Sequence, residues 1–293
     1  MKIISVVGAR PNFIKIAPFI EQVRKKNNIV HVLVHTGQHY DDRMSKVFFD
    51  KLGIPKPDIN LSVGSGTHSE QVGNTMIAFE KVLIKEQPDW VVVVGDVNAT
   101  LACSVTAKKL NIKVCHIEAG LRSGDINMPE EINRLVTDRI SDLLLTPDKI
   151  SSKNLEMEGV PENKIKFVGN IMIDTLVENE KKANQLAINE LVGFTNKPFA
   201  LLTLHRPSNV DDEESFRRIL VALESVGEKI PIVFPMHPRT KNRIEEFGLE
   251  QRVASIPNVV LTGPIGYLDF VALISNSQMV LTDSGGLQEE TTA

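Results

Sequence analysis

The sequence predicts an α/β fold built from two doubly wound parallel β-sheets. Short runs of β-branched and other apolar residues recur along the chain, and each is followed by an amphipathic stretch of helical length. Near-continuous apolar strands are typical of a parallel sheet that is covered on both faces, and crossover helices join such strands. The pattern pauses once in a polar helical stretch and then resumes, which indicates a second sheet.

Six runs in the first half are expected to form strands: "KIISVV", "IVHVLVH", "WVVVVG", "IKVCHI", "DLLLT" and "KIKFV". The polar stretch "IDTLVENEKKANQLAINELVG" comes next, so we place a domain boundary near residue 170, with a linking helix across it. The predicted domains are 1–170 and 171–293. The second contains four readable strands: "FALLTLH", "PIVFP", "NVVLTG" and "MVLTD". Because the sequence stops at "LTDSGGLQEETTA", we expect the second domain to be incomplete.

Composition narrows the function classes. With 42% hydrophobic residues, the 293-residue chain can bury a substantial core. A net charge of -4 gives no global field that would attract nucleic acid or an anionic membrane, so a bound phosphate needs a local site. Cys103 and Cys115 lack metal-ligand spacing and are expected to be reduced core residues. The apolar run in "MKIISVVGARPNF" is too short for a signal peptide or a membrane span, which favours the cytoplasm.

Ligands of doubly wound sheets bind where strands end and helices begin, so each strand exit is a candidate site. At the first, "VVGARPNFIK", a helix start with free amides could hold an anion, and Arg10 and Lys15 could add positive charge. An ordinary helix start with two surface bases is the alternative. The stretch lacks the G-x-G-x-x-G spacing of a dinucleotide site. At the second, "VHTGQHY", His35 and His39 favour a polar substrate-contacting loop over a metal site.

Acidic residues follow the next two strands. Asp96 comes directly after Gly95 in "WVVVVGDVNAT", where it could serve a site or cap the next helix. In "CHIEAGLRSGDINMPEEINR", Glu118 emerges at a strand tip and Glu131 lies near a helix start, three residues before Arg134. Complementing the helix N-terminus is the plainer explanation for the acids of that helix. Adjacent strand exits, however, should bring three carboxylates toward one cleft, where each would raise the pKa of the others.

The second half offers three more exits: "LTLHRPSN", "FPMHPRT" and "LTDSGGLQEE". His205 with Arg206, and His237, lie at the first two. The turn Ser284-Gly285-Gly286 exposes backbone N–H groups that could hold a phosphate. Glu290, about one helical turn further on, could accept the hydroxyls of a ribose. A glycine-rich helix start without a ligand is the alternative.

Taken together, these motifs resemble the non-hydrolysing UDP-N-acetylglucosamine 2-epimerases, in which two Rossmann-like domains form the GT-B architecture. The resemblance covers essentially the whole chain. It rests on nine ordered motifs: "GARPNFIK", "HTGQHYD", "GDVNAT", "HIEAGLRS", "MPEEINR", "LTLHR", "MHPRT", "TGPIGYLDF" and "TDSGGLQEE". The family continues past the glycine pair with an "ERPE"-type segment and a closing helix, so the resemblance implies a chain that is truncated at its C-terminus.

The resemblance implies a role for each matched position. Asp96, Glu118 and Glu131 match the catalytic acids, Lys15 matches a basic residue of the same site, and His205 matches a histidine near the leaving phosphate. The positions that match the UDP-binding set are Arg10, His237, Ser284, Gly285, Gly286 and Glu290. We add three arginines that follow strands to the substrate-binding set, namely Arg122, Arg134 and Arg206, and expect the first two to orient carboxylates.

The implied reaction eliminates UDP across C1–C2 of a UDP-2-acetamido sugar and re-adds it with inverted configuration at C2. It needs no redox cofactor and no metal, and the resemblance implies a homodimer. Removing a weakly acidic proton and returning one to the opposite face calls for more than one acid or base, while the diphosphate calls for fixed positive charge. We expect the sugar to lie in the interdomain cleft, with its diphosphate against the second domain.

Several alternatives stay open. The chain also resembles a related branch that acts on UDP-2,3-diacetamido sugar acids. A GT-B glycosyltransferase and a non-catalytic nucleotide-sugar sensor are further possibilities. Val97 stands where many members have threonine, and the segments "QHYDDRMS" and "VGSGTHSE" differ from those of members activated by their own substrate.

Overall fold

A computed structural model describes residues 1–37, 56–183, 185–186, 188, 192–193 and 198–291. The chain divides into two compact units, Met1–Thr175 and Leu176–Ala293. Helix α7 (Ile171–Ala183) contributes residues to both units, whereas the sequence analysis placed the boundary near residue 170.

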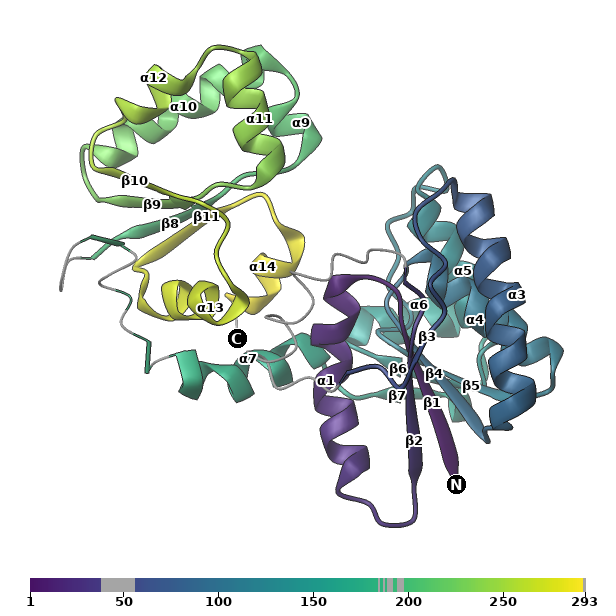
Figure 1. Cartoon of the computed structure of the whole chain (residues 1–293). Helices are drawn as coiled ribbons and strands as arrows, with labels where there is room; N and C mark the ends of the chain where they lie inside the picture. The colour runs from purple at the N-terminus through teal and green to yellow at the C-terminus, as the bar shows by residue number, and fades with distance from the viewer. Residues whose placement is uncertain (38–55, 184, 187, 189–191, 194–197, 292–293) are drawn as a thin grey trace. The chain divides into compact units, whose positions relative to one another are not determined.

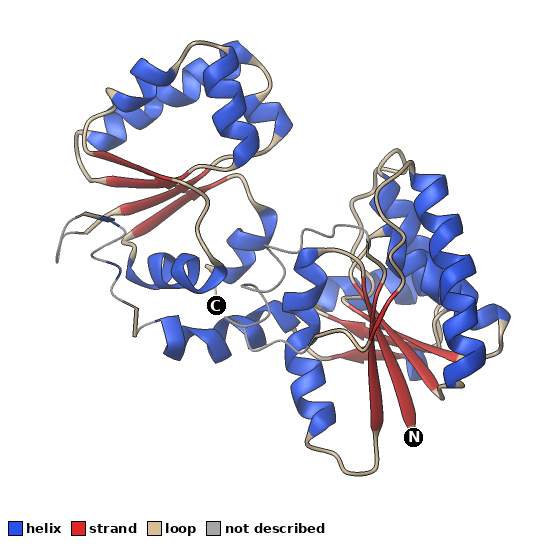
Figure 2. Cartoon of the chain, viewed as in Figure 1, coloured by secondary structure: helices blue, strands red, loops and turns tan. Residues whose placement is uncertain are grey.

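The first unit contains a parallel sheet of seven strands in the order β3-β2-β1-β4-β5-β6-β7. Figure 2 shows its strands in red and the helices around them in blue. The strands are β1 (Lys2–Val7), β2 (Val30–His35), β3 (Ile59–Asn60), β4 (Trp90–Val94), β5 (Lys113–Ile117), β6 (Leu143–Thr146) and β7 (Ile165–Phe167). All six predicted strands are present. The seventh, β3, was missed because two residues are too few to show an apolar period; it pairs with the last two residues of β2.

Helices cover both faces of this sheet. They are α1 (Arg10–Arg24), α3 (His68–Glu86), α4 (Asn98–Lys109), α5 (Pro129–Ile140) and α6 (Lys149–Met157), with a short 3₁₀ helix, η1 (Glu162–Lys164), before β7. Figure 1 shows α3, α4 and α5 side by side on one face and α1 on the other. Because successive strand residues point to opposite faces, Ile4 and Val6 of β1 pack against Phe79 of α3 and Cys103 of α4.

The second unit contains a smaller parallel sheet of four strands in the order β10-β9-β8-β11. The strands are β8 (Ala200–Thr203), β9 (Ile232–Pro235), β10 (Val259–Thr262) and β11 (Met279–Thr282), and each corresponds to a predicted run. The helices are α9 (Pro207–Val210), α10 (Glu213–Gly227), α11 (Pro238–Glu246), α12 (Glu250–Ala254), α13 (Tyr267–Asn276) and α14 (Gly285–Glu290). Leu202 packs with Phe216 of α10, whereas Leu201 packs with Leu273 of α13, so this sheet is also covered on both faces.

Strand order locates the candidate sites. It reverses between β1 and β4 in the first sheet and between β8 and β11 in the second. At such a switch point the loops leave the sheet in opposite directions and open a crevice beyond the carboxyl ends of the strands. The exits of β4 and β5, and those of β8 and β11, carry most of the residues singled out from the sequence.

The two cysteines lie in the core, as predicted. Cys103 and Cys115 are free and buried, and burial raises the pKa of the Cys115 thiol to about 12, as expected for inert core residues. In the part of the chain that the structure describes, every helix is too short or too polar to cross a membrane.

Candidate active site

The first group of site residues surrounds Glu118, directly after β5. Its carboxylate accepts a hydrogen bond from Lys15 Nζ of α1 at 2.5 Å. Glu118 has a φ of 72°, in the left-handed region that residues other than glycine rarely adopt. Strained backbone of this kind clusters at functional sites, where the surrounding structure enforces it. Glu118 therefore has a strained backbone at the strand tip, and this strain could not be predicted from the sequence.

Gly95, at the exit of β4, lies against the Lys15–Glu118 pair. A Cβ atom built on it would lie 3.3 Å from Glu118 Oε2 and 3.7 Å from Lys15 Nζ. Its φ of 69° also favours glycine. The absence of a side chain at this position therefore leaves room for the ion pair.

Asp96 and Glu131 are joined by one arginine. Arg134 of α5 donates from Nη2 to Asp96 Oδ2 at 2.5 Å and from Nη1 to Glu131 Oε2 at 2.7 Å. The N-cap residue of α4 is Val97, so Asp96 is not the helix cap that the sequence left open as an alternative. The geometry instead places Asp96, Arg134 and Glu131 in one ion-pair network beside Gly95.

Glu131 is held more firmly than a surface acid at a helix N-terminus. Only 3% of it is exposed, and its carboxylate accepts the backbone N–H groups of Ser123 at 3.0 Å and Gly124 at 3.1 Å. Burial by itself raises the pKa of Glu131, but these two N–H groups and the Arg134 guanidinium more than offset that effect and lower the pKa to about 2. The expectation that neighbouring carboxylates raise one another's pKa is therefore wrong for Glu131, because fixed donors dominate its surroundings.

This environment predicts an acid-sensitive contribution to stability. Since folding lowers the pKa of Glu131 from about 4.5 to about 2, its contribution is present above pH 4.5 and is lost as the pH falls toward 2. Denaturant unfolding at pH 7, 4 and 3 should show that Glu131→Gln removes about 1–3 kcal/mol of this pH dependence. Glu130→Gln is the matched control. An unchanged slope in Glu131→Gln would contradict the assignment.

A second buried network of charged residues, which was not predicted, connects the exits of β4 and β5. His116 of β5 places Nδ1 2.6 Å from Asp138 Oδ1 and Nε2 2.9 Å from the carbonyl oxygen of Gly95. Asp138 of α5 also accepts the Gly120 N–H at 3.0 Å. Asp138 lies four residues after Arg134 and seven after Glu131, so helical spacing was the available signal.

Arg122 belongs to this network. Its Nη1 donates to Asp138 Oδ2 at 2.8 Å, and its Nε and Nη2 form a two-pronged pair with Glu158 at 2.7 Å each. Arg122 was predicted both to bind substrate and to orient carboxylates. The contacts observed in the structure are of the second kind.

The second group of site residues gathers around Asp283, directly after β11. His205 Nδ1 lies 2.7 Å from Asp283 Oδ1, and the backbone N–H groups of His205 and Arg206 donate to Asp283 Oδ2 at 2.9 Å and 2.8 Å. Burial by itself raises the pKa of Asp283, but these N–H donors and the amide of Asn209 lower it. Asp283 was missed, although it follows its strand as Asp96 follows β4. That repetition was the available signal.

Several of the predicted residues lie near this carboxylate. The rings of His205 and His237 lie 5.5 Å apart. The pKa of His237 is lowered, mainly by burial and to a smaller extent by the nearby His205. Arg206 Nη2 would lie 3.6 Å from a Cβ atom on Gly285. The structure therefore brings His205, Arg206, His237 and Gly285 to one switch point. Next to Gly285, Ser284 accepts the Leu287 N–H at 3.4 Å, so its hydroxyl caps α14.

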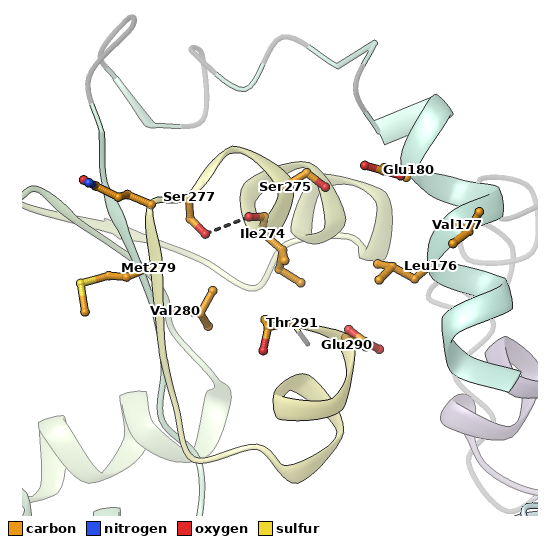
Figure 3. A pocket seen from close by; sticks show the side chains of 11 residues that line it. Leu176, Val177, Glu180, Ile274, Ser275, Ser277, Met279, Val280, Glu290 and Thr291 are labelled. Atoms are coloured by element: carbon orange, nitrogen blue, oxygen red, sulfur yellow. Dashed lines mark hydrogen bonds between the residues drawn. The ribbon is translucent and has the colours of Figure 1, made fainter. Parts of the chain in front are cut away.

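Glu290 lies in a different environment. Glu290, the last residue of α14, is 9% exposed and, with Thr291 directly after it, lines a pocket of about 410 Å³. Figure 3 shows these two residues with Ile274 of α13 and Val280 of β11, across from Leu176 of α7. Burial and the charge of Glu290 raise the pKa of Tyr267, which begins α13. A Cβ atom on Gly286 would meet no atom within 4 Å, so the first turn of α14 is open there.

Two predicted residues fall outside the described side chains. Arg10 is the first residue of α1, but its side chain lies outside the described part of the structure, and so does the whole of His39. His35 is buried at the end of β2, with its ring 5.1 Å from that of Phe13. Among the described residues, no three His, Cys, Asp or Glu side chains form a group that could hold a metal ion.

Known proteins resemble the chain over nearly its whole length. A protein from Methanocaldococcus jannaschii called UDP-N-acetylglucosamine 2-epimerase is 47% identical, with 99% of this chain and 80% of the relative covered. A Pseudomonas aeruginosa protein called UDP-2,3-diacetamido-2,3-dideoxy-D-glucuronate 2-epimerase is 42% identical with the same coverage. This chain thus spans about four-fifths of the length of these relatives.

A solved structure and a family profile agree with these matches. The crystal structure of the M. jannaschii UDP-GlcNAc 2-epimerase in complex with UDP-GlcNAc and UDP superimposes with a TM-score of 0.85 at 45% identity. The comparison covers 99% of this chain and 81% of that one. The sequence profile of the family described as UDP-N-acetylglucosamine 2-epimerase matches residues 21–293. The chain therefore belongs to the UDP-N-acetylglucosamine 2-epimerase family.

Proposed function

We propose that the chain interconverts UDP-N-acetylglucosamine and UDP-N-acetylmannosamine by inverting C2. The observation that carries the proposal is the joint placement of the Lys15–Glu118 pair and the Asp96–Arg134–Glu131 network at the exits of β4 and β5. Inverting a carbon that bears a weakly acidic proton requires one group to accept a proton and another to deliver one to the opposite face. One carboxylate paired with Lys15 and others paired with Arg134 can serve as the acceptor and the donor of these protons.

The proposed reaction balances without an external reagent. A carboxylate takes the C2 proton, the electron pair of that C–H bond forms the C1–C2 double bond, and the C1–O bond breaks to release UDP. The bound 2-acetamidoglucal then accepts a proton at C2 on the opposite face while UDP re-adds at C1. Of the candidate groups, we assign Asp96, Glu118, Glu131 and Lys15 to the sugar; Arg134 positions two of these carboxylates.

The group around Asp283 suits the departing nucleotide. Arg206 supplies fixed positive charge beside a glycine-rich turn, and the ring of His205 lies next to it. These groups would stabilise the negative charge that develops on the diphosphate as the C1–O bond breaks. We propose that His237, Ser284, Gly285 and Gly286 complete this UDP site. Arg10 and Glu290 stay in the proposed UDP-binding set on the strength of their sequence match.

Asp283 gives this assignment a test. In Asp283→Asn, one of the two acceptor oxygens becomes an NH₂ group and the negative charge is lost, so the N–H donors of His205 and Arg206 compete for a single acceptor oxygen. We expect UDP affinity, measured by titration calorimetry, to fall by about tenfold, equivalent to about 1.4 kcal/mol. Glu224→Gln, which removes an ion pair with Arg252 between α10 and α12, is the control and should bind UDP like the parent chain. Equal affinity in both variants would refute the role of Asp283.

Product analysis tests the function itself. Incubation with UDP-N-acetylglucosamine should yield UDP-N-acetylmannosamine until an equilibrium mixture forms, with UDP and both sugars accounted for. Release of free N-acetylmannosamine would indicate a hydrolysing enzyme instead. Product that forms only when an acceptor is added would indicate a glycosyltransferase.

A second substrate is favoured by one specific observation. The P. aeruginosa relative named for a UDP-2,3-diacetamido sugar acid is 42% identical, close to the 47% of the M. jannaschii relative. We therefore propose the diacetamido sugar acid as the alternative substrate. Comparing kcat/KM for the two UDP-sugars decides between them, and the larger value identifies the natural substrate class.

We further propose that the protein acts as a homodimer in the cytoplasm, in a route to cell-surface polysaccharide. Exposed apolar side chains recur on α3 and α5, including Ile77, Ile84 and Ile132, which supports association with a second copy. The two free, buried cysteines suit a reducing compartment. Sedimentation at micromolar concentration should give twice the mass of the chain, and a monomer would refute the dimer.

A further inference from the structure

We propose that His116 and Asp138 are positioning residues that hold Glu118 and the β4 exit in their catalytic arrangement. This inference rests on the proposed function, because it concerns the same site. Neither residue touches the Lys15–Glu118 pair through a hydrogen bond of its own. They act instead on the backbone that carries Glu118 and Asp96.

Asp138 clamps the turn that contains Glu118 at both ends. One carboxylate oxygen lies 2.6 Å from His116 Nδ1, two residues before Glu118. The other accepts the N–H of Gly120, two residues after it, at 3.0 Å. Between these two points Glu118 has a φ of 72°. Since an L-residue resists this conformation, contacts on either side of it are needed to hold it in place.

His116 connects this turn to the neighbouring strand exit. Its Nε2 lies 2.9 Å from the carbonyl oxygen of Gly95, the residue that precedes Asp96. A carbonyl oxygen can only accept, so Nε2 carries a proton, and Nδ1 faces a carboxylate that Arg122 also contacts. The ring is therefore a charged imidazolium with both nitrogens donating.

The electrostatics of the buried network agree with that protonation state. His116 and Asp138 are each 1% exposed. Burial by itself lowers the pKa of His116, but the charge of Asp138, the hydrogen bonds to Asp138 and Gly95, and the charge of Glu118 raise it above its ordinary value. A buried charge with both donors satisfied rigidifies its surroundings.

Two substitutions separate the two contacts of the ring. His116→Asn keeps a donor near the position of Nδ1, facing Asp138, and removes the contact to Gly95. His116→Gln keeps a donor near the position of Nε2, facing Gly95, and removes the contact to Asp138. The matched control is Asp142→Asn. Asp142 also accepts a backbone N–H of β5, from Val114 at 2.8 Å, and a lysine, but at the amino end of the strand.

The test combines kinetics with backbone hydrogen exchange on the full chain. For both His116 variants we expect kcat for epimerisation to fall by about tenfold to a hundredfold, with KM within about threefold of the parent value. In peptide mass spectrometry, deuterium uptake should rise at residues 94–100 in His116→Asn and at residues 117–122 in His116→Gln. Asp142→Asn should lower the melting temperature and leave kcat within about twofold.

Three outcomes would overturn the proposal: unchanged uptake at both segments, parental kcat in both His116 variants, or an equal loss of kcat in Asp142→Asn. If the parent chain shows no epimerisation, the proposed function fails, and the exchange data alone still decide the positioning role. If either His116 variant lacks a cooperative melting transition, Asp138→Asn takes its place. That variant should raise uptake at residues 117–122.

Discussion

Glu118→Gln is expected to reduce the rate of C2 inversion by about 10²- to 10⁴-fold, the range that a positioned acid or base contributes. The neutral amide can neither accept a proton from C2 nor pair with the Lys15 ammonium, which lies 2.5 Å from the carboxylate. The glutamine has nearly the same shape, so the strained turn and the fold should survive. The measurement is kcat for conversion of UDP-N-acetylglucosamine, with UDP affinity as a check on binding.

Lys15→Met, alone and combined with Glu118→Gln, tests whether the two side chains act together. Because Lys15 and Glu118 act as a pair, the double variant should be no slower than the worse of the two single variants. Additive losses would show that the two side chains act independently. A Glu118→Gln variant that retains more than about a tenth of parental kcat would show that Glu118 is not the proton-transfer group.

Glu131→Gln is expected to abolish C2 inversion, whereas Glu130→Gln should leave most of it. The Glu131 carboxylate accepts two backbone N–H groups and the Arg134 guanidinium. A glutamine at this position has one acceptor oxygen in place of two, so its NH₂ group faces at least one of these donors. It also removes the negative charge beside Arg134, which holds Asp96. We therefore expect a loss of about 10²- to 10⁴-fold in kcat, whether Glu131 moves a proton or fixes the charge around it.

Glu130 provides the matched control because it occupies the same helical turn and carries the same charge. Its substitution removes only a favourable interaction with the N-terminus of α5, about 0.3–1 kcal/mol of stability. Both variants should be assayed at a temperature well below their melting transitions. Comparable activity in the two would remove Glu131 from the proposed catalytic set.

The apolar runs were sufficient to predict the fold. All ten predicted strands are present, because buried parallel strands are nearly continuous in apolar residues. The exception is β3, whose pairing depends on its position beside β2 and not on any period of its own. The sequence was also sufficient to place Gly95 and Asp96 after β4 and Glu118 at the tip of β5.

Side-chain pairing was not readable from the sequence. The pKa of Glu131 depends on N–H groups of Ser123 and Gly124, which a loop brings back to the helix start. The positive φ of Glu118 depends on contacts made by Asp138, twenty residues further along the chain. The position of Asp283 directly after a strand is visible in the sequence, but its hydrogen-bond partners come from the exit of another strand, β8. Such partners become apparent only when the chain is folded.

Proton exchange at C2 tests the central claim most directly. The full chain should be incubated with UDP-N-acetylglucosamine in heavy water, and both sugars should then be examined by NMR. The account predicts UDP-N-acetylmannosamine with deuterium at C2, and deuterium entering C2 of the remaining substrate as the reaction reverses. Epimer formed without deuterium at C2 would contradict proton transfer with solvent-exchangeable carboxylates, and unlabelled substrate alone would contradict the activity on this sugar.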